Sequence, residues 1–183
     1  SKPGPALMTL WQKGPDGWKS FMIEDSDSNV FHKVIPYKDG LITIGAEKAY
    51  LKYWTVKDGK WSAETWWHPD WNGKFDRLRD IEIGDVDGDG KEELVVATHD
   101  YGVIGVGKFG PDGKPVFTEL DATPDTFVHE VEIGDIDGDG DLDLVTSNYG
   151  GGTWTILENN GSGTFSNPRT LHAMTAGSCA TLH

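Results

Sequence analysis

Acidic residues at alternate positions form the part of this sequence whose chemistry is most specific. Two stretches 50 residues apart share the spacing, with Asp85, Asp87, Asp89 and Glu93 in the first and Asp135, Asp137, Asp139 and Asp143 in the second. Carboxylates at close quarters repel one another unless a cation neutralises them. Ca²⁺ takes about 6–8 oxygen ligands, and an alternating acidic loop supplies them as it coils around the ion. The pattern therefore predicts two Ca²⁺ sites.

The other positions of these loops agree with that prediction. The seventh residue is Lys91 in one loop and Asp141 in the other, and each is expected to contribute its backbone carbonyl. Gly88 and Gly90 permit backbone angles that larger residues resist. The alternative is two acidic turns without metal, but two copies in register, each with an acid at the ninth position, favour calcium.

Neither loop fits the EF-hand pattern, which needs a bidentate Glu at position twelve and a helix on each side. Position twelve is Val96 in the first copy and Thr146 in the second, and both lie in apolar runs typical of β-strands. We therefore expect each loop to join two strands.

The motif G-D-x-D-G-D-G-x-x-[DE] at 84–93 and 134–143 resembles the calcium-loop repeats called FG-GAP or VCBS repeats. Such repeats occur in the β-propellers of integrin α subunits and in many secreted bacterial proteins. Glu93 departs mildly from the Asp that is usual at its position. The resemblance implies a propeller fold and bound calcium, and it does not identify a ligand.

Strand-like segments separated by turn signals extend over the whole chain, and no helical periodicity is sustained. They predict an all-β fold, a β-propeller or partial propeller of four-stranded antiparallel blades. The expected divisions are an outer hairpin of a partial blade at 1–28, a blade without a calcium loop at 29–75, two blades with calcium loops at 76–125 and 126–172, and the start of a further blade at 173–183.

Turns in this pattern fall at Gly-containing sequences that favour tight hairpins. They are Gly14-Pro15-Asp16-Gly17, Lys57-Asp58-Gly59, Gly110-Pro111-Asp112-Gly113 and Asn160-Gly161. In the first full repeat the connection between Val34 and Leu41 is shorter than its counterparts and contains one carboxylate, Asp39. We expect a plain turn without metal there.

The net charge of −14 argues against nucleic acid and anionic membranes as partners, because both call for basic patches. No apolar run is long enough to cross a bilayer, so no membrane insertion is expected. Cys179 is the only cysteine, which excludes an internal disulfide. Calcium loops rich in aspartate suggest secretion to an extracellular or periplasmic setting.

His32, Arg79 and His129 occupy equivalent positions near the start of three predicted inner strands. His99 follows a second strand and should come to the same end of the propeller, opposite the calcium loops. Such a ring could bind an anionic or sugar ligand or a transition metal. The alternative is that these are solvated loop residues with no shared role, and the sequence favours this alternative.

Aromatic residues offer a second kind of ligand surface. Trp66, Trp67 and Trp71 flank a short polar segment and could form a carbohydrate platform, but large aromatics more often wedge between blades. Trp71 and Tyr149 lie in predicted loops and are the exposed candidates for ligand binding.

No catalytic triad, Cys-His pair or H-E-x-x-H motif is present, and the loop acids are committed to calcium. The sequence therefore favours a calcium-stabilised scaffold for adhesion or for binding a carbohydrate or protein ligand. The alternative is a catalytic or non-catalytic module of a secreted sugar-processing lyase or dehydratase, which such repeats also resemble.

The repeat pattern is interrupted at both ends. The last segment, 178–182, resembles an inner strand, and the chain stops where another calcium loop would begin. We expect a segment of a longer propeller that self-associates through its end blades, because unpaired sheet edges favour pairing with another chain.

Overall fold

The computed structural model describes residues 4–74, 76–99, 102–121 and 127–172. Within these ranges the chain is built from strands alone, which confirms the expected all-β fold. The strands are β1 (Ala6–Gly14), β2 (Gly17–Asp25), β3 (Phe31–Tyr37), β4 (Gly40–Gly45), β5 (Leu51–Lys57), β6 (Lys60–Trp67), β7 (Leu78–Gly84), β8 (Glu93–Thr98), β9 (Ile104–Phe109), β10 (Pro115–Asp121), β11 (Val128–Gly134), β12 (Asp143–Asn148), β13 (Thr153–Asn159) and β14 (Phe165–His172). Among the described residues, no helix has the length and apolar character that a bilayer crossing requires.

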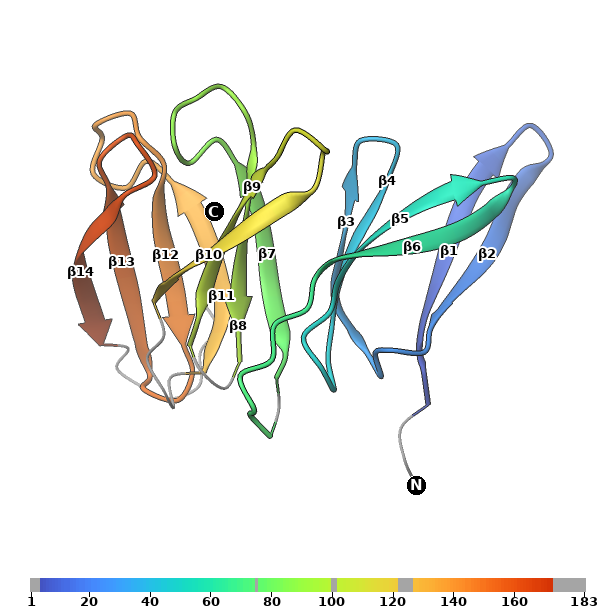
Figure 1. Ribbon diagram of the computed structural model, residues 1–183, viewed down its shortest axis with the longest axis horizontal. Helices are drawn as coiled ribbons and strands as arrows, with labels where there is room; N and C mark the ends of the chain where they lie inside the picture. The colour runs from blue at the N-terminus through green and yellow to red at the C-terminus, as the bar shows by residue number, and fades with distance from the viewer. Residues whose placement is uncertain (1–3, 75, 100–101, 122–126, 173–183) are drawn as a thin grey trace.

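Twelve of the strands form three antiparallel sheets of four, each following the chain order. We call them the first (β3–β6), second (β7–β10) and third (β11–β14) sheets. Figure 1 shows them side by side, with the separate β1–β2 hairpin beyond the first sheet. β7 contacts both β3 and β11, so the first strands of the three sheets are neighbours. This arrangement is that of consecutive propeller-like blades.

Two apolar cores hold the sheets together. The first lies between the first and second sheets and the second lies between the second and third. β8 contributes to both, because Leu94 and Val96 face one core while Val95 and Ala97 face the other. All four side chains are fully buried. Alternate residues of a strand point to opposite faces of its sheet. A strand whose sheet is covered on both faces therefore has apolar residues at consecutive positions.

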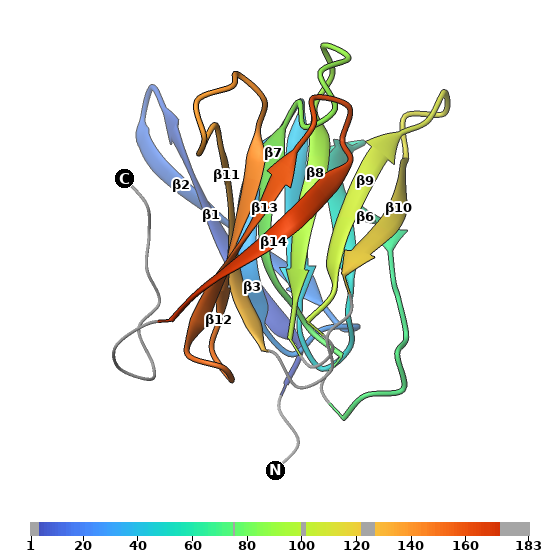
Figure 2. The same cartoon turned by 90° about the vertical axis from the view of Figure 1, so that its left-hand side faces the viewer.

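The connections between strands differ in length and in the end of the molecule at which they lie. At one end of the molecule lie the connections β7–β8, β11–β12 and β13–β14, as both views show (Figures 1 and 2). The expected hairpins at Pro15-Asp16 and Asp58-Gly59 are confirmed, with Gly14 paired to Gly17 and Lys57 to Lys60. The β3–β4 turn is equally short, since Tyr37 pairs with Gly40, and its Asp39 accepts a 2.6 Å hydrogen bond from the Tyr53 hydroxyl.

The β13–β14 connection is longer than the tight hairpin expected at Asn160-Gly161, so that expectation is wrong. Asn159 pairs with Phe165, which leaves residues 160–164 in the loop. The Asn160 side-chain oxygen accepts hydrogen bonds from the backbone N–H groups of Ser162 and Thr164, which stabilises the wider loop. The segment 173–183, expected to start a further blade, lies outside the described residues.

Candidate functional site

Each acidic loop brings three carboxylates together beside the first residue of a strand. In the first loop they belong to Asp85, Asp87 and Glu93, and each offers an oxygen within 4.8 Å of the others. Glu93 starts β8 and pairs with Gly84 at the end of β7, so the ladder itself fixes the two ends of the loop. The second loop repeats the arrangement with Asp135, Asp137 and Asp143.

The backbone of each loop coils around its own carboxylates. The N–H of Gly90 donates to Asp85 Oδ2 at 2.9 Å, and the N–H of Asp89 donates to Asp87 Oδ1 at 3.1 Å. Gly88 and Gly90 adopt φ of 71° and 84°, in the left-handed region that favours glycine. The second loop has the same bonds, with Gly140 donating to Asp135 at 3.2 Å. The shared sequence thus folds into the same loop twice.

Polar groups in the first loop are incompletely satisfied by the protein. Asp85 Oδ1 is buried and has no hydrogen-bond partner. Burial raises the pKa of Glu93, and the charges of Asp87 and Asp89 add to this effect. An orphaned carboxylate oxygen beside crowded acids fits a bound hard cation, which would supply the missing partner and relieve the repulsion.

Four of the predicted ligands are placed differently from these six carboxylates. Asp89 and Asp139 lie outside the two three-carboxylate groups found among the described residues. Asp89 instead accepts from the backbone N–H of Lys91 at 2.9 Å and pairs with its ammonium at 2.7 Å, and Asp139 accepts from the N–H of Asp141 at 3.0 Å. Their part in metal binding, and that of the carbonyls of Lys91 and Asp141, stays a prediction.

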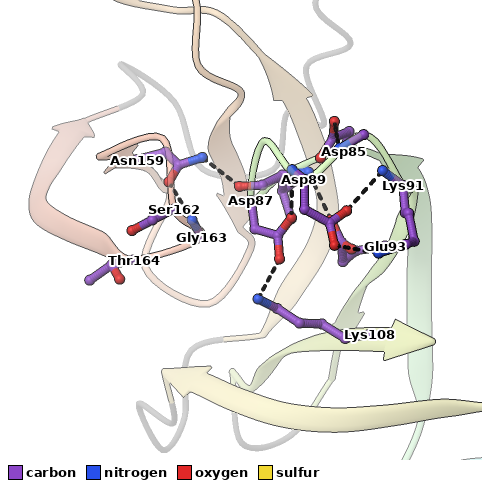
Figure 3. A network of polar contacts seen from close by, with 12 residues as sticks. Asp85, Asp87, Asp89, Lys91, Glu93, Lys108, Asn159, Ser162, Gly163 and Thr164 are labelled. Carbon is purple, nitrogen blue, oxygen red and sulfur yellow. Dashed lines mark hydrogen bonds and ion pairs between the residues drawn. The ribbon is translucent and has the colours of Figure 1, made fainter. Parts of the chain in front are cut away.

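Two residues that sequence reasoning missed also contact the loops. The Lys108 ammonium lies 2.6 Å from Asp87 Oδ2, so one positive charge already faces the first loop (Figure 3). Asn159 reaches the same loop from the third sheet, through a 2.7 Å bond to the carbonyl of Val86. In the repeat alignment Lys108 corresponds to Glu158, so only the first loop has this lysine.

The histidines and arginine meet at the opposite end of the inner strands. The guanidinium of Arg79, near the start of β7, has Nη1 at 3.4 Å from His32 Nε2 and Nη2 at 3.4 Å from His129 Nδ1. His129 also stacks on Tyr149, with ring centroids 4.8 Å apart, and its ring lies 6.0 Å from that of His99. Five of the six predicted ligand-binding residues are therefore brought together.

A cavity of about 350 Å³ opens at this cluster. Its lining combines cations, acids, imidazoles and one aromatic ring, from Phe31, His32, Lys33, Arg79, Asp80, His129 and Glu130. Lys33 lies 2.8 Å from Asp80 and 2.5 Å from Glu82, which ties β3 to β7 beside the cavity. The cavity thus presents donors and acceptors on a framework of paired strands.

The profile of the FG-GAP-like repeat matches this sequence over residues 85–146 and again over 135–182. Together the two matches cover more than half of the chain. The chain belongs to the FG-GAP-like repeat family. Comparison with curated proteins found no match. Each FG-GAP-like repeat match begins at the first aspartate of an acidic loop, so the acidic loop marks the start of the matched repeat.

The sixth predicted ligand-binding residue of this FG-GAP-like repeat protein, Trp71, lies elsewhere. Its ring packs edge-on against Trp67 at 5.9 Å, and its Nε1 donates to Glu119 at 3.0 Å. The expectation that Trp71 is exposed is wrong, because the ring is half-buried against the first core. Trp67 in turn stacks on Phe117 of the second sheet, as expected for a wedge between blades. Tyr149 is 54% exposed, as expected.

Neutral imidazoles surround Arg79. Burial and the neighbouring Arg79 charge lower the pKa of His32 to about 4, with smaller contributions from Arg77 and His99. Burial and Arg79 also lower the pKa of His129. Because the carbonyl of Leu78 can only accept, His32 Nδ1 carries the proton in their 2.9 Å hydrogen bond, and the Nε2 lone pair faces Arg79.

This neutral His32 predicts how stability changes in acid. The unfolded chain protonates His32 near pH 6.5 and the folded chain only near pH 4, so stability falls as the pH drops through this window. We expect His32→Gln to reduce the loss of melting temperature between pH 6.5 and 4. His172→Gln, at an exposed position of β14, serves as the control. Identical pH profiles for His32→Gln and wild type would contradict this assignment.

Proposed function

We propose that this FG-GAP-like repeat protein is a secreted, calcium-stabilised scaffold of propeller type. Carbohydrate binds at the end of the inner strands where His32, Arg79 and His129 lie. The observation that carries the calcium assignment is the convergence of three carboxylates in each of two matching loops. The donors are all hard oxygens, and each loop is a glycine-containing turn whose ligand spacing does not impose octahedral geometry. Both properties suit Ca²⁺ better than Mg²⁺, which demands near-ideal octahedral geometry, or than the softer transition metals.

In this proposal the calcium ions are structural. The acidic loops follow the ends of β7 and β11, whereas Arg79 and His129 lie at the second position of the same strands. A seven-residue strand spans about 20 Å, so a ligand at the cavity would not reach either ion. In this arrangement calcium stabilises the end of the sheets that carries the acidic loops, and the ligand binds at the opposite end, beside Arg79 and His129.

Carbohydrate is the ligand class that the cavity suits best. Its volume of about 350 Å³ lies at the lower end of the range for small-molecule sites. Sugar hydroxyls need both donors and acceptors, and Arg79 provides donors while the carboxylate of Glu130, whose Oε2 is buried without a hydrogen-bond partner among the described residues, provides an acceptor. The exposed ring of Tyr149, stacked on His129, offers a surface for a sugar face.

Binding to an array of neutral and acidic oligosaccharides tests this function. Wild-type protein with Ca²⁺ should retain a defined set of glycans, and Arg79→Ala should weaken that binding by roughly tenfold or more, as expected for loss of a charged hydrogen bond. Arg169→Ala is the matched control, because Arg169 is exposed on β14 and pairs with Glu158. Absence of glycan binding by wild type, or equal weakening in both variants, would contradict the proposed site.

One observation favours a second candidate, a module that also acts on its sugar. His129 is held neutral beside the fixed positive charge of Arg79. A neutral imidazole can accept a proton, and an adjacent guanidinium can stabilise the negative charge that develops, which is the chemistry of a lyase or dehydratase. Formation of unsaturated product from a bound oligosaccharide, lost in His129→Gln while binding persists, would favour this candidate over a pure binding scaffold.

A further inference from the structure

Asn159 connects the two acidic loops through hydrogen bonds. It is the last residue of β13 and only 6% exposed. Its side-chain amide donates one hydrogen to the carbonyl of Val86 in the first loop at 2.7 Å and the other to the carbonyl of Leu142 in the second loop at 2.9 Å. Both donors of the amide are therefore used, one on each loop.

The remaining polar atoms of Asn159 strengthen this link. Its backbone N–H donates to Asp143 Oδ1 at 2.9 Å, and Asp143 is one of the three converging carboxylates of the second loop. Its side-chain oxygen accepts from the N–H of Gly163 at 3.1 Å, which holds the β13–β14 turn against the same residue. Because Val86 lies between Asp85 and Asp87, the hydrogen bond to its carbonyl also places Asn159 beside the first predicted cation site (Figure 3).

The β13–β14 turn also fills the space between the loops. A Cβ on Gly163 would lie 2.9 Å from the Cβ of Asp87, and a Cβ on Gly161 would lie 2.5 Å from Asp141 Oδ2. Both glycines have positive φ, at 69° and 75°. The turn is thus in close contact with the first loop on one side and the second on the other, so neither loop can shift freely past it.

The equivalent residue in the second sheet shows that this link depends on the type of loop it meets. Phe109 ends β9 as Asn159 ends β13, and it faces the short β3–β4 turn of the first sheet. There it stacks on Tyr37 with ring centroids 5.4 Å apart. An aromatic contact therefore stands beside the plain turn, whereas an amide that bonds backbone carbonyls stands beside the acidic loop.

We propose that Asn159 couples the two cation loops, so that Ca²⁺ bound in one raises the affinity of the other. This inference rests on the proposed function, because it requires both loops to bind Ca²⁺. An ion in the first loop fixes Asp85 and Asp87, and with them the carbonyl of Val86 that orients Asn159. The ordered Asn159 side chain then fixes the carbonyl of Leu142, and with it the adjacent Asp143, which reduces the entropy lost when the second ion binds. By linkage the effect is reciprocal.

Calorimetric titration of the calcium-free chain with Ca²⁺ tests the coupling. Asp137→Ala leaves only the first site and Asp87→Ala leaves only the second, and each variant gives one association constant. With coupling, the product of the two wild-type constants exceeds the product of these single-site constants by about fivefold or more, the lower end of typical allosteric couplings. Asn159→Leu, combined with each single-site variant, should reduce this excess to about one.

Asn160→Ala is the matched control, since Asn160 lies in the same turn and, among the residues that the structure describes, its side chain bonds within that turn only. It should keep the coupling, and a merely structural Asn159 would lower stability without changing the ratio of constants. Equal products in wild type and in the single-site variants would overturn the coupling, and this comparison remains valid even if Asn159→Leu does not fold. Absence of Ca²⁺ binding by wild type would overturn the proposed function as well, whereas two independent sites would overturn the coupling alone.

Discussion

Ca²⁺ added to the calcium-free chain should raise its melting temperature by roughly 10–20 °C. A ligand at ~100 times its dissociation constant stabilises by about 2.7 kcal/mol per site, and each kcal/mol corresponds to about 2–4 °C in a protein of this size. Two sites together give the expected shift. A chelator should reverse it, and the shift should grow with Ca²⁺ concentration, as mass action requires.

Single substitutions should divide this effect between the loops. Asp87→Ala and Asp137→Ala should each remove about half of the calcium-dependent shift, because each removes one of three converging carboxylates. Asp112→Ala is the control, since Asp112 is also an aspartate in a glycine-flanked turn but lies in the β9–β10 connection. Scanning calorimetry with and without Ca²⁺ measures all four proteins. A melting temperature that does not respond to Ca²⁺ in wild type would contradict the expectation.

The second large effect concerns a buried ion pair. Lys52 of β5 lies 2.5 Å from Asp25 at the end of β2 and 2.6 Å from Asp27, and the side chains of Lys52 and Asp25 are 5% and 3% exposed. Burial alone would lower the pKa of Lys52, but the bonds to Asp25 and Asp27 outweigh it and raise the pKa. The pair fastens the β1–β2 hairpin to the first sheet.

Lys52→Ala should lower the free energy of unfolding by about 3–5 kcal/mol, because it leaves Asp25 charged and buried without its partner. Lys114→Ala breaks an exposed pair with Glu64, in which both side chains are 49% exposed, and should lower the free energy of unfolding far less, because solvent screens this pair. Urea unfolding of both variants measures the difference. Equal costs in the two variants would show that the Lys52 pair does not hold the hairpin.

The sequence predicted the strands well because their signals are local. Alternating apolar residues and glycine-containing turns predicted the all-β fold, and repetition of the acidic motif aligned the second sheet with the third. The alignment of His32, Arg79 and His129 also predicted their proximity, since equivalent positions on neighbouring inner strands lie at the same end of a propeller.

Contacts between distant segments could not be predicted in this way. Asn159 and Val86 are 73 residues apart, and Lys52 and Asp25 are 27 apart. Neither contact produces a periodic pattern in the sequence, because each depends on how two elements pack together and not on the residue pattern of a single element. The exposure of Trp71 was predicted wrongly for the same reason. The sequence around it is typical of an exposed loop, and the contact that partly buries it comes from Glu119 of the second sheet.

The number of Ca²⁺ ions bound per chain tests the central claim most directly. Metal analysis and calorimetric titration of the same calcium-loaded protein give this number independently. We expect two ions in wild type, one in Asp87→Ala and one in Asp137→Ala, and none when both substitutions are combined. Binding of no calcium by wild type, or the same number of ions in all four proteins, would show that the acidic loops are not calcium sites.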